Sequence, residues 1–212
     1  MAAHAEPAAH AEHEHHGPAT YTYQPNPFKL DPTTLGLVIF LTSEIALFGA
    51  FFLYYGHNRL VRHYEWPQPG FEIPANGTAF NTAILVASSF TCELVLIMLV
   101  RNLRRAAIAW MIVTILFGSA FLGLQAREYM EIGFTPATNA MGSTFFSLTG
   151  LHGAHVFLGI SLLTYCLIRL IRGHFSKDGM VGLVITSIYW HFVDVVWIVL
   201  YTLVYLLPTH VT

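Results

Sequence analysis

The sequence predicts an all-α fold, a polytopic membrane helix bundle with five transmembrane helices, the amino terminus inside and the carboxyl terminus outside. Of the 212 residues, 55% are hydrophobic and only 10% are charged, and the mean hydropathy is +0.55. A soluble domain carries about 25% charged residues, so this chain has too few to cover a water-facing surface. The net charge of −2 argues against a nucleic-acid binder. The apolar residues form continuous runs of about 20, the length of a membrane-spanning helix.

The chain divides into a tail, a membrane domain and a second short tail. Residues 1–32 are polar and are predicted to form a flexible cytoplasmic tail, whose histidines (His4, His10, His13, His15 and His16) we expect to be solvated, because no fixed metal-ligand geometry is implied. The five predicted spans of the transmembrane domain, residues 33–207, are 35–55, 78–100, 106–124, 145–171 and 181–207. Residues 208–212 are a short outer tail.

The distribution of basic residues predicts the orientation, because cytoplasmic loops carry an excess of Lys and Arg. Seven basic residues flank the spans on one side: Lys29, Arg101, Arg104, Arg105, Arg169, Arg172 and Lys177. Three lie on the other: Arg59, Arg62 and Arg127. The side with seven is predicted to be the inside.

Three acids lie within the predicted spans: Glu44, Glu93 and Asp194. A charged side chain at a helix centre costs about 2.5–3.5 kcal/mol on insertion scales. Such residues normally face protein or a water-filled path and indicate function. The alternative is a structural hydrogen bond between helices with the acid neutral, and the residues alone favour the two equally.

Histidines accompany these acids at helical spacing. His152 and His155 are three residues apart, as are His191 and Asp194, so each pair is expected to share a helix face. An Asp can fix the tautomer of a neighbouring His, which serves a metal site or a polar network. Haem or metal ligation by His152 and His191 from facing helices is the less favoured hypothesis, and a structural or proton-handling network is the favoured one.

Features near the helix ends predict further contacts. Arg101, Arg104 and Arg105 form a cluster that could hold anionic lipid head groups, although a topology signal explains it equally well. Gln125, Glu128 and Tyr129 are predicted to form a polar cap at the outer interface, with simple solvation as the alternative. Small residues predict close helix contacts: Gly36, Gly49, Gly118, Gly123, Gly150, Gly153 and Gly159.

Five motifs, in order, resemble subunit III of the haem–copper cytochrome c oxidases. They are LTSEIALFGAFFLYY, FNTAILVASSFT, LQAREY, LTGLHGAHVFLGI and SIYWHFVDVVWIVLYTLVYL, and together they extend over most of residues 33–207. Many members of that family have seven helices, and this chain resembles the shorter five-helix bacterial form. The buried polar residues Glu44, His152, His155, His191 and Asp194 match the family by position, whereas Glu93 has no clear counterpart.

The resemblance implies a non-catalytic subunit of a proton-pumping terminal oxidase in aerobic electron transport. It implies no catalytic, cofactor-binding or metal residue on this chain, with haem and copper on partner subunits and phospholipid as a bound molecule. The implied partners are oxidase subunits I and II, membrane lipid and, as further candidates, other respiratory complexes, but no nucleic acid. The implied location is the bacterial inner (plasma) membrane, crossed several times.

Three other functions are weighed against this one. The first is subunit III of a quinol oxidase, since the electron donor depends on other subunits. The second is an independent proton channel or transporter, which the intramembrane acids favour but the lack of an internal repeat does not. The third is a small haem-bearing membrane cytochrome that uses its own histidines.

Overall fold

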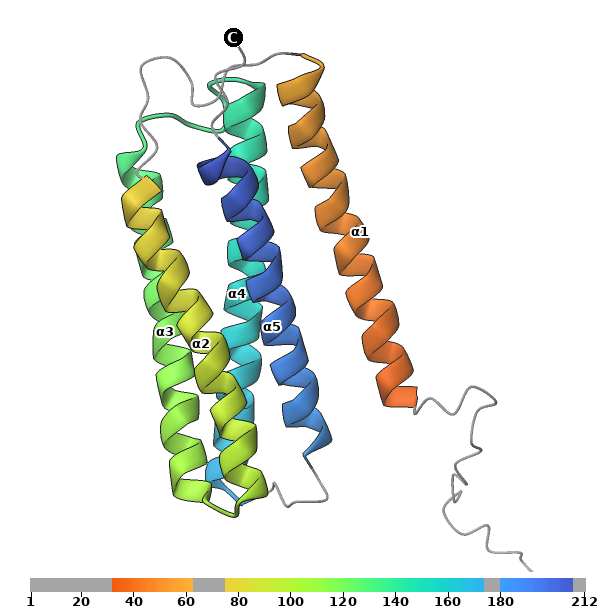
Figure 1. Ribbon diagram of the computed structural model, residues 1–212, viewed down its shortest axis with the longest axis vertical. Coiled ribbons are helices and arrows are strands. Elements are labelled where there is room, and N and C mark those ends of the chain that lie inside the picture. Colours follow the sequence, from red (N-terminus) through yellow and green to blue (C-terminus); the bar gives the residue numbers. More distant parts are fainter. Residues whose placement is uncertain (1–31, 63–74, 174–179, 208–212) are drawn as a thin grey trace, which may run out of the picture. The chain divides into compact units, whose positions relative to one another are not determined.

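The computed structural model describes residues 32–62, 75–173 and 180–207, and the regular structure within these ranges is entirely helical. Five of the described helices are long and apolar enough to cross a membrane. This confirms the predicted fold class of a five-helix membrane protein (Figure 1). The predicted tails 1–32 and 208–212 lie outside the described residues, apart from Pro32, which begins the first helix.

The helices are longer at several ends than their apolar runs. Their bounds are α1 Pro32–Leu60, α2 Ala75–Val100, α3 Arg104–Glu131, α4 Ala140–Ile171 and α5 Val181–Tyr201, followed by a π-helical turn, η1, at Thr202–Leu206. The third predicted span ended at residue 124, but α3 continues through polar residues to Glu131. Apolar composition marks the hydrocarbon-crossing part of a helix, whereas backbone hydrogen bonding continues into the interface.

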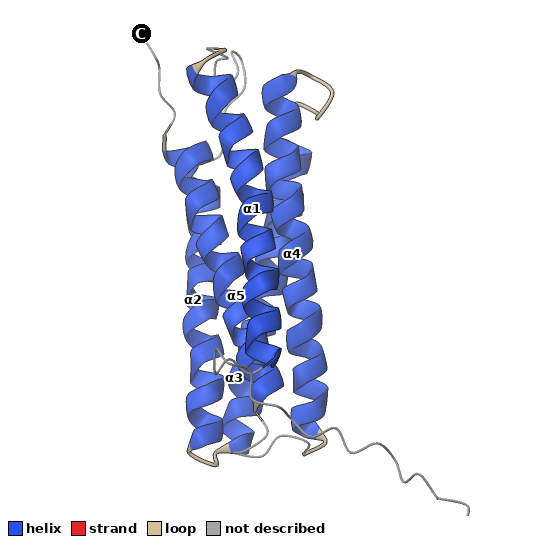
Figure 2. Cartoon of the chain, turned by 90° about the vertical axis from the view of Figure 1, so that its right-hand side faces the viewer, coloured by secondary structure: helices blue, strands red, loops and turns tan. Residues whose placement is uncertain are grey.

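Helices α2, α3, α4 and α5 form a closed ring of neighbours. Contacts join α2 to α3, α3 to α4, α4 to α5, and α5 back to α2, and the four run side by side in Figures 1 and 2. The described residues from Leu37 onward belong to one compact unit, and the described part of the preceding unit, 32–36, is the first part of α1. From Leu37 onward α1 contacts α4 and η1: the rings of Phe48 and His155 lie 5.0 Å apart, and the Tyr55 hydroxyl donates to the Leu203 carbonyl over 3.1 Å.

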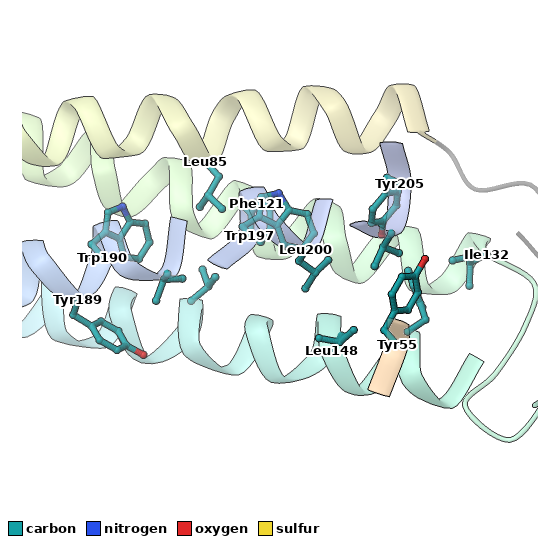
Figure 3. Close-up of a cluster of buried hydrophobic side chains, with 14 of the residues drawn as sticks. Tyr55, Leu85, Phe121, Ile132, Leu148, Tyr189, Trp190, Trp197, Leu200 and Tyr205 are labelled. Carbon is teal, nitrogen blue, oxygen red and sulfur yellow. The ribbon is translucent and has the colours of Figure 1, made fainter. Parts of the chain in front are cut away.

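Two tryptophans of α5 fill the space inside the ring. Trp190 and Trp197 are both fully buried, and Figure 3 shows them, with Phe121, among the helices. The Trp190 ring lies so close to α3 and α4 that a Cβ at Gly118 or Gly159 would approach its atoms to 2.6 and 2.7 Å. Helices in lipid associate through close packing rather than the hydrophobic effect, so these glycines allow the central contact of the bundle.

Candidate functional site

An acid–histidine pair joins α1 to α4 inside the membrane domain. Glu44 Oε2 lies 2.8 Å from His155 Nε2, and the two side chains are 15% and 13% exposed. His155 Nδ1 lies 2.8 Å from the Leu151 carbonyl, which can only accept, so Nδ1 carries a hydrogen. Glu44 and His155 Nε2 therefore share a single proton, which either atom can hold. Both arrangements leave the pair electrically neutral, which lowers the cost of placing it in the hydrocarbon region.

The pair is fixed by neighbours from two helices. The Tyr189 hydroxyl of α5 donates to the backbone carbonyl of His155 over 3.2 Å. The Phe48 ring of α1 meets the imidazole edge-on. The first contact fixes the backbone at His155 and the second packs against its ring, so the pair has a defined position between α1, α4 and α5.

A second polar cluster joins α2 to α5 and contains Ser89, Glu93, His191 and Asp194. The Ser89 hydroxyl donates to Asp194 Oδ2, and Ser89 Oγ lies 3.1 Å from His191 Nδ1. Because the single hydrogen of the hydroxyl is given to Asp194, Ser89 accepts from Nδ1–H of His191. The predicted pairing of Asp194 with His191 thus runs through Ser89, which the sequence indicated only as part of the motif FNTAILVASSFT and without a role.

The α2–α5 cluster extends from the outside of the bundle to its interior. The Glu93 and His191 side chains are 55% and 38% exposed, and Glu93 Oε2 lies 3.7 Å from His191 Nε2. Asp194 is only 4% exposed, and its Oδ1 has no hydrogen-bond partner among the described residues. Of the three intramembrane acids, Glu93 is therefore the one on the outer surface.

His152 occupies a different environment from His155. It is fully buried, with its ring centroid 5.8 Å from Phe121 and 4.8 Å from Trp197, and its ring nitrogens have no hydrogen-bond partner among the described residues. The contacts of His191 are with Ser89 and Glu93 instead. Within the described ranges, no three His, Cys, Asp or Glu side chains come together as a metal site requires.

The residues predicted to cap the far end of α3 lie in the interior. Gln125 and Glu128 are 4% and 7% exposed. The Glu128 carboxylate accepts hydrogen bonds from Thr78 of α2 (3.0 Å) and from Tyr205 of η1 (2.6 Å). They are buried instead of solvated because α3 continues to Glu131 and is covered there by α2 and η1.

A further hydrogen bond at this end comes from the neighbouring tyrosine of the predicted cap. The Tyr129 hydroxyl donates to Thr149 of α4 over 2.6 Å. Beside the carboxylate of Glu128, a surface pocket of about 250 Å³ lies between α2 and α3, and Thr78, Asn81, Arg127, Glu128 and Glu131 are among its lining residues.

The arginine cluster is divided between two environments. Arg104 donates to the Leu170 carbonyl through Nε (3.0 Å) and Nη2 (2.8 Å), and to the Ile171 carbonyl through Nη2 (2.7 Å). These are terminal carbonyls of α4, which lack partners within that helix. All three arginines are exposed, but the Arg104 guanidinium is engaged with α4, so Arg101 and Arg105 remain the candidates for binding lipid head groups.

Sequence reasoning missed several polar residues of the bundle. The indole N–H groups of Trp190 and Trp197 donate to Ser88 and Thr82 of α2 over 3.0 and 2.9 Å. Near the end of α1, Arg59 is 7% exposed and donates to the Leu207 carbonyl over 3.5 Å. The polar sequence GHNR directly after an apolar run could have indicated that residue, since the predicted span ended at 55.

Comparison with known proteins was made for the whole chain. A family model described as "Cytochrome c oxidase subunit III" matches residues 16–209. "Cytochrome c oxidase subunit 3" of Thermostichus vulcanus is 39% identical over 180 residues, which cover 84% of this chain and 88% of the relative. The proteins of that name from Formosania lacustris and Danio rerio are each 41% identical over 180 residues, covering 80% of this chain and 67% of theirs.

Proposed function

This chain belongs to the cytochrome c oxidase subunit III family, and we propose that it serves its oxidase as a non-catalytic subunit that stabilises subunit I, binds lipid and assists proton uptake. It is a multi-pass membrane protein and a subunit of an oxidase complex. The observation that carries the proposal is the family match, which extends through all five spans. That match replaces the hypotheses of an independent transporter and of a small cytochrome.

We propose finer assignments as well. We place the complex in a bacterial plasma membrane, with subunits I and II as partners, oxygen reduction and proton translocation as its reaction, and haem and copper on those partners. The relatives' names favour cytochrome c over quinol as electron donor. The environment of His152 supports the assignment of haem elsewhere, because aromatic rings stand beside its ring in the core.

The Glu44–His155 pair is our candidate for the contribution to proton uptake. Its shared proton, neutral net charge and fixed imidazole suit a group that takes up and releases protons without large structural change. The pair belongs to the α1–α4 contact, so an alternative role is helix association alone. These two roles predict different results when the carboxyl is removed.

Purification tests the proposal. An affinity-tagged chain, extracted in mild detergent from native membranes, should bring down a haem–copper subunit I and subunit II with the visible absorption bands of haem. Recovery of the chain alone would contradict the assignment.

A variant of the pair tests the proton role within that complex. Glu44→Ala should leave the subunit content of the complex unchanged and shorten the time for which oxygen consumption is sustained. Glu44→Gln keeps a hydrogen bond to His155 but cannot carry the carboxyl proton, so it separates loss of the acid from loss of the contact. If Glu44→Ala removes the subunit from the complex, the pair is structural.

A further inference from the structure

The outer face of α2 and α5 carries an ionisable pair in an otherwise apolar surface. Glu93 is flanked along α2 by Phe90 (70% exposed) and Ile97 (37%). Along α5, His191 is followed on the same side by Val195, which is 59% exposed. A surface that met only acyl chains would have no use for a half-exposed carboxyl at this position.

The depth of Glu93 makes that exposure costly. It precedes the end of α2 at Val100 by seven residues, which places it about 10 Å from the helix end at about 1.5 Å per residue. By the same rise, the 26 residues of α2 give a helix of about 39 Å, compared with about 30 Å of hydrocarbon. The carboxyl group therefore lies within the hydrocarbon region. The 3.7 Å separation from His191 Nε2 is an ion-pair distance but exceeds a hydrogen bond, so the exposed carboxyl can still accept a hydrogen bond from outside.

We propose that this face is the surface on which another subunit of the oxidase packs, and that a transmembrane helix of that subunit presents a hydrogen-bond donor to Glu93. The donor is a hydroxyl, amide or basic side chain, because the carboxyl oxygens accept hydrogen bonds and bear the negative charge when the group is ionised. This inference rests on the proposed function in one respect, membership of a multi-subunit oxidase. It adds the contacting face and the chemistry of the contact.

The same face of α2 has room for a neighbouring helix. Ala79 and Ala83 are exposed, and steps of three and four residues from Ala83 through Val86 lead to Phe90 and Glu93 on the same side of α2. Small residues at this spacing let helix backbones approach closely in membranes, and polar side chains then hydrogen-bond across the contact. A row of small residues and a carboxyl that needs a donor therefore point to the same occupant.

Lipid and a second copy of this chain explain the surface less well. Acyl chains offer no hydrogen-bond donor, and phosphate head groups are anionic and lie beyond the helix end from which Glu93 is recessed. A second copy related by two-fold symmetry would present the same patch, and so a second Glu93 carboxyl together with a second His191, rather than a new donor alone. A donor-bearing helix of a different subunit has neither difficulty.

Photocrosslinking in the purified oxidase tests the assignment. A benzoylphenylalanine residue at position 93 should crosslink this chain to another oxidase subunit, identified by mass spectrometry. The matched control is position 112, an exposed isoleucine of α3 that lies eight residues from the helix start at Arg104 and so at similar depth. Crosslinks from 93 only to lipid, only to a second copy of this chain, or with the same yield and partner as from 112 would each overturn the inference.

Substitution of Glu93 provides a second readout. Glu93→Leu should release the subunit at a lower detergent concentration than the unaltered chain, and Glu93→Gln should restore most of the retention. If the face met lipid, Glu93→Leu would instead leave retention unchanged or increase it. Because Glu93 is on the outside of this subunit, its loss should not unfold the bundle. If the oxidase purifies intact but position 93 crosslinks to lipid, this inference fails and the proposed function stands. If no oxidase subunit co-purifies, the proposed function itself fails.

Discussion

Ser89 shows how one small hydroxyl decides the chemistry of two ionisable residues. It donates to Asp194 and accepts from His191, so it sets the tautomer of the imidazole and gives the buried carboxyl a donor. Removing one member of a buried hydrogen bond costs the desolvation of the group left behind, about 1–3 kcal/mol, whereas removing both can be nearly neutral. The hydrogen bonds of this cluster therefore predict how substitutions of Ser89 and Asp194 combine.

Asp194→Ala should lower the melting temperature of the detergent-purified complex and weaken retention of this subunit, because Ser89 loses its acceptor. The double variant Ser89→Ala with Asp194→Ala should be less destabilised than the sum of the two single variants, since both members of the Ser89–Asp194 bond are then absent. The loss of the Ser89 contact with His191 is common to Ser89→Ala and the double variant. Strict additivity of the three melting shifts would contradict a direct Ser89–Asp194 bond.

At the scale of single residues, the polar residues that could be predicted were those of a type that is rare in apolar runs. Glu44, His155, His191 and Asp194 stand out because ionisable groups are rare in apolar runs, and the structure places each of them in a polar contact between helices. Ser88 and Thr82 do not stand out, because a hydroxyl can bond to its own helix backbone. Their partners, the indoles of α5, are more than 100 residues away in sequence, so no local pattern indicates them.

Among the elements, α5 has the central place because Trp190 reaches both α3 and α4. Gly118→Ala should be destabilising, because its Cβ would lie 2.6 Å from the Trp190 ring, and overpacking of this kind typically costs about 1–3 kcal/mol. Gly123→Ala on the same helix is the control, since nothing lies within 4 Å of its Cβ position. Thermal melting should separate the two variants, and equal melting temperatures would show that Trp190 can move aside.

The same comparison explains why glycine was only partly informative. The predicted close helix contacts are found at Gly118 and Gly159. A Cβ at Gly150 or Gly153 would reach only ordinary contact distance, 3.9 Å. Nothing lies within 4 Å at Gly36, Gly49 or Gly123. A glycine permits close approach, but whether a large side chain uses the space depends on the facing helix.

Helix ends supply a second prediction at the scale of elements. Arg104→Ala should destabilise the complex because it removes the guanidinium that donates to the Leu170 and Ile171 carbonyls at the end of α4, although Leu170 keeps the backbone N–H of Gly173 as a donor. Hydrogen bonds to charged groups contribute about 1.5–3 kcal/mol. Arg105→Ala, which removes an exposed neighbour of like charge, should leave the melting temperature within experimental error. Equal effects of the two substitutions would mean that charge near the lipid, rather than capping, is what matters.

For the whole molecule, the apolar runs predicted the membrane-spanning helices better than the polar residues predicted where those helices end. The number of spans and their centres follow from apolar runs about as long as the hydrocarbon is thick, and the structure has five such helices. The ends do not follow, because α3 and α1 continue as helices through polar residues that a hydropathy argument assigns to loops. Glu128 and Arg59 lie in those extensions, which explains why their burial was not foreseen.

The orientation of the bundle is the remaining prediction for the whole molecule. The end with seven basic residues should be cytoplasmic, and five spans then place the carboxyl end outside. Alkaline phosphatase fused after Thr212 should be active in a bacterial host, and green fluorescent protein fused there should be dark. At the connection between α2 and α3, fused phosphatase should be inactive and fused green fluorescent protein should fluoresce. Because Arg104 also caps α4, neutralising Arg101 and Arg105 tests the charge rule without removing that cap. Fluorescence from a fusion after Thr212 would show that the basic end faces outward.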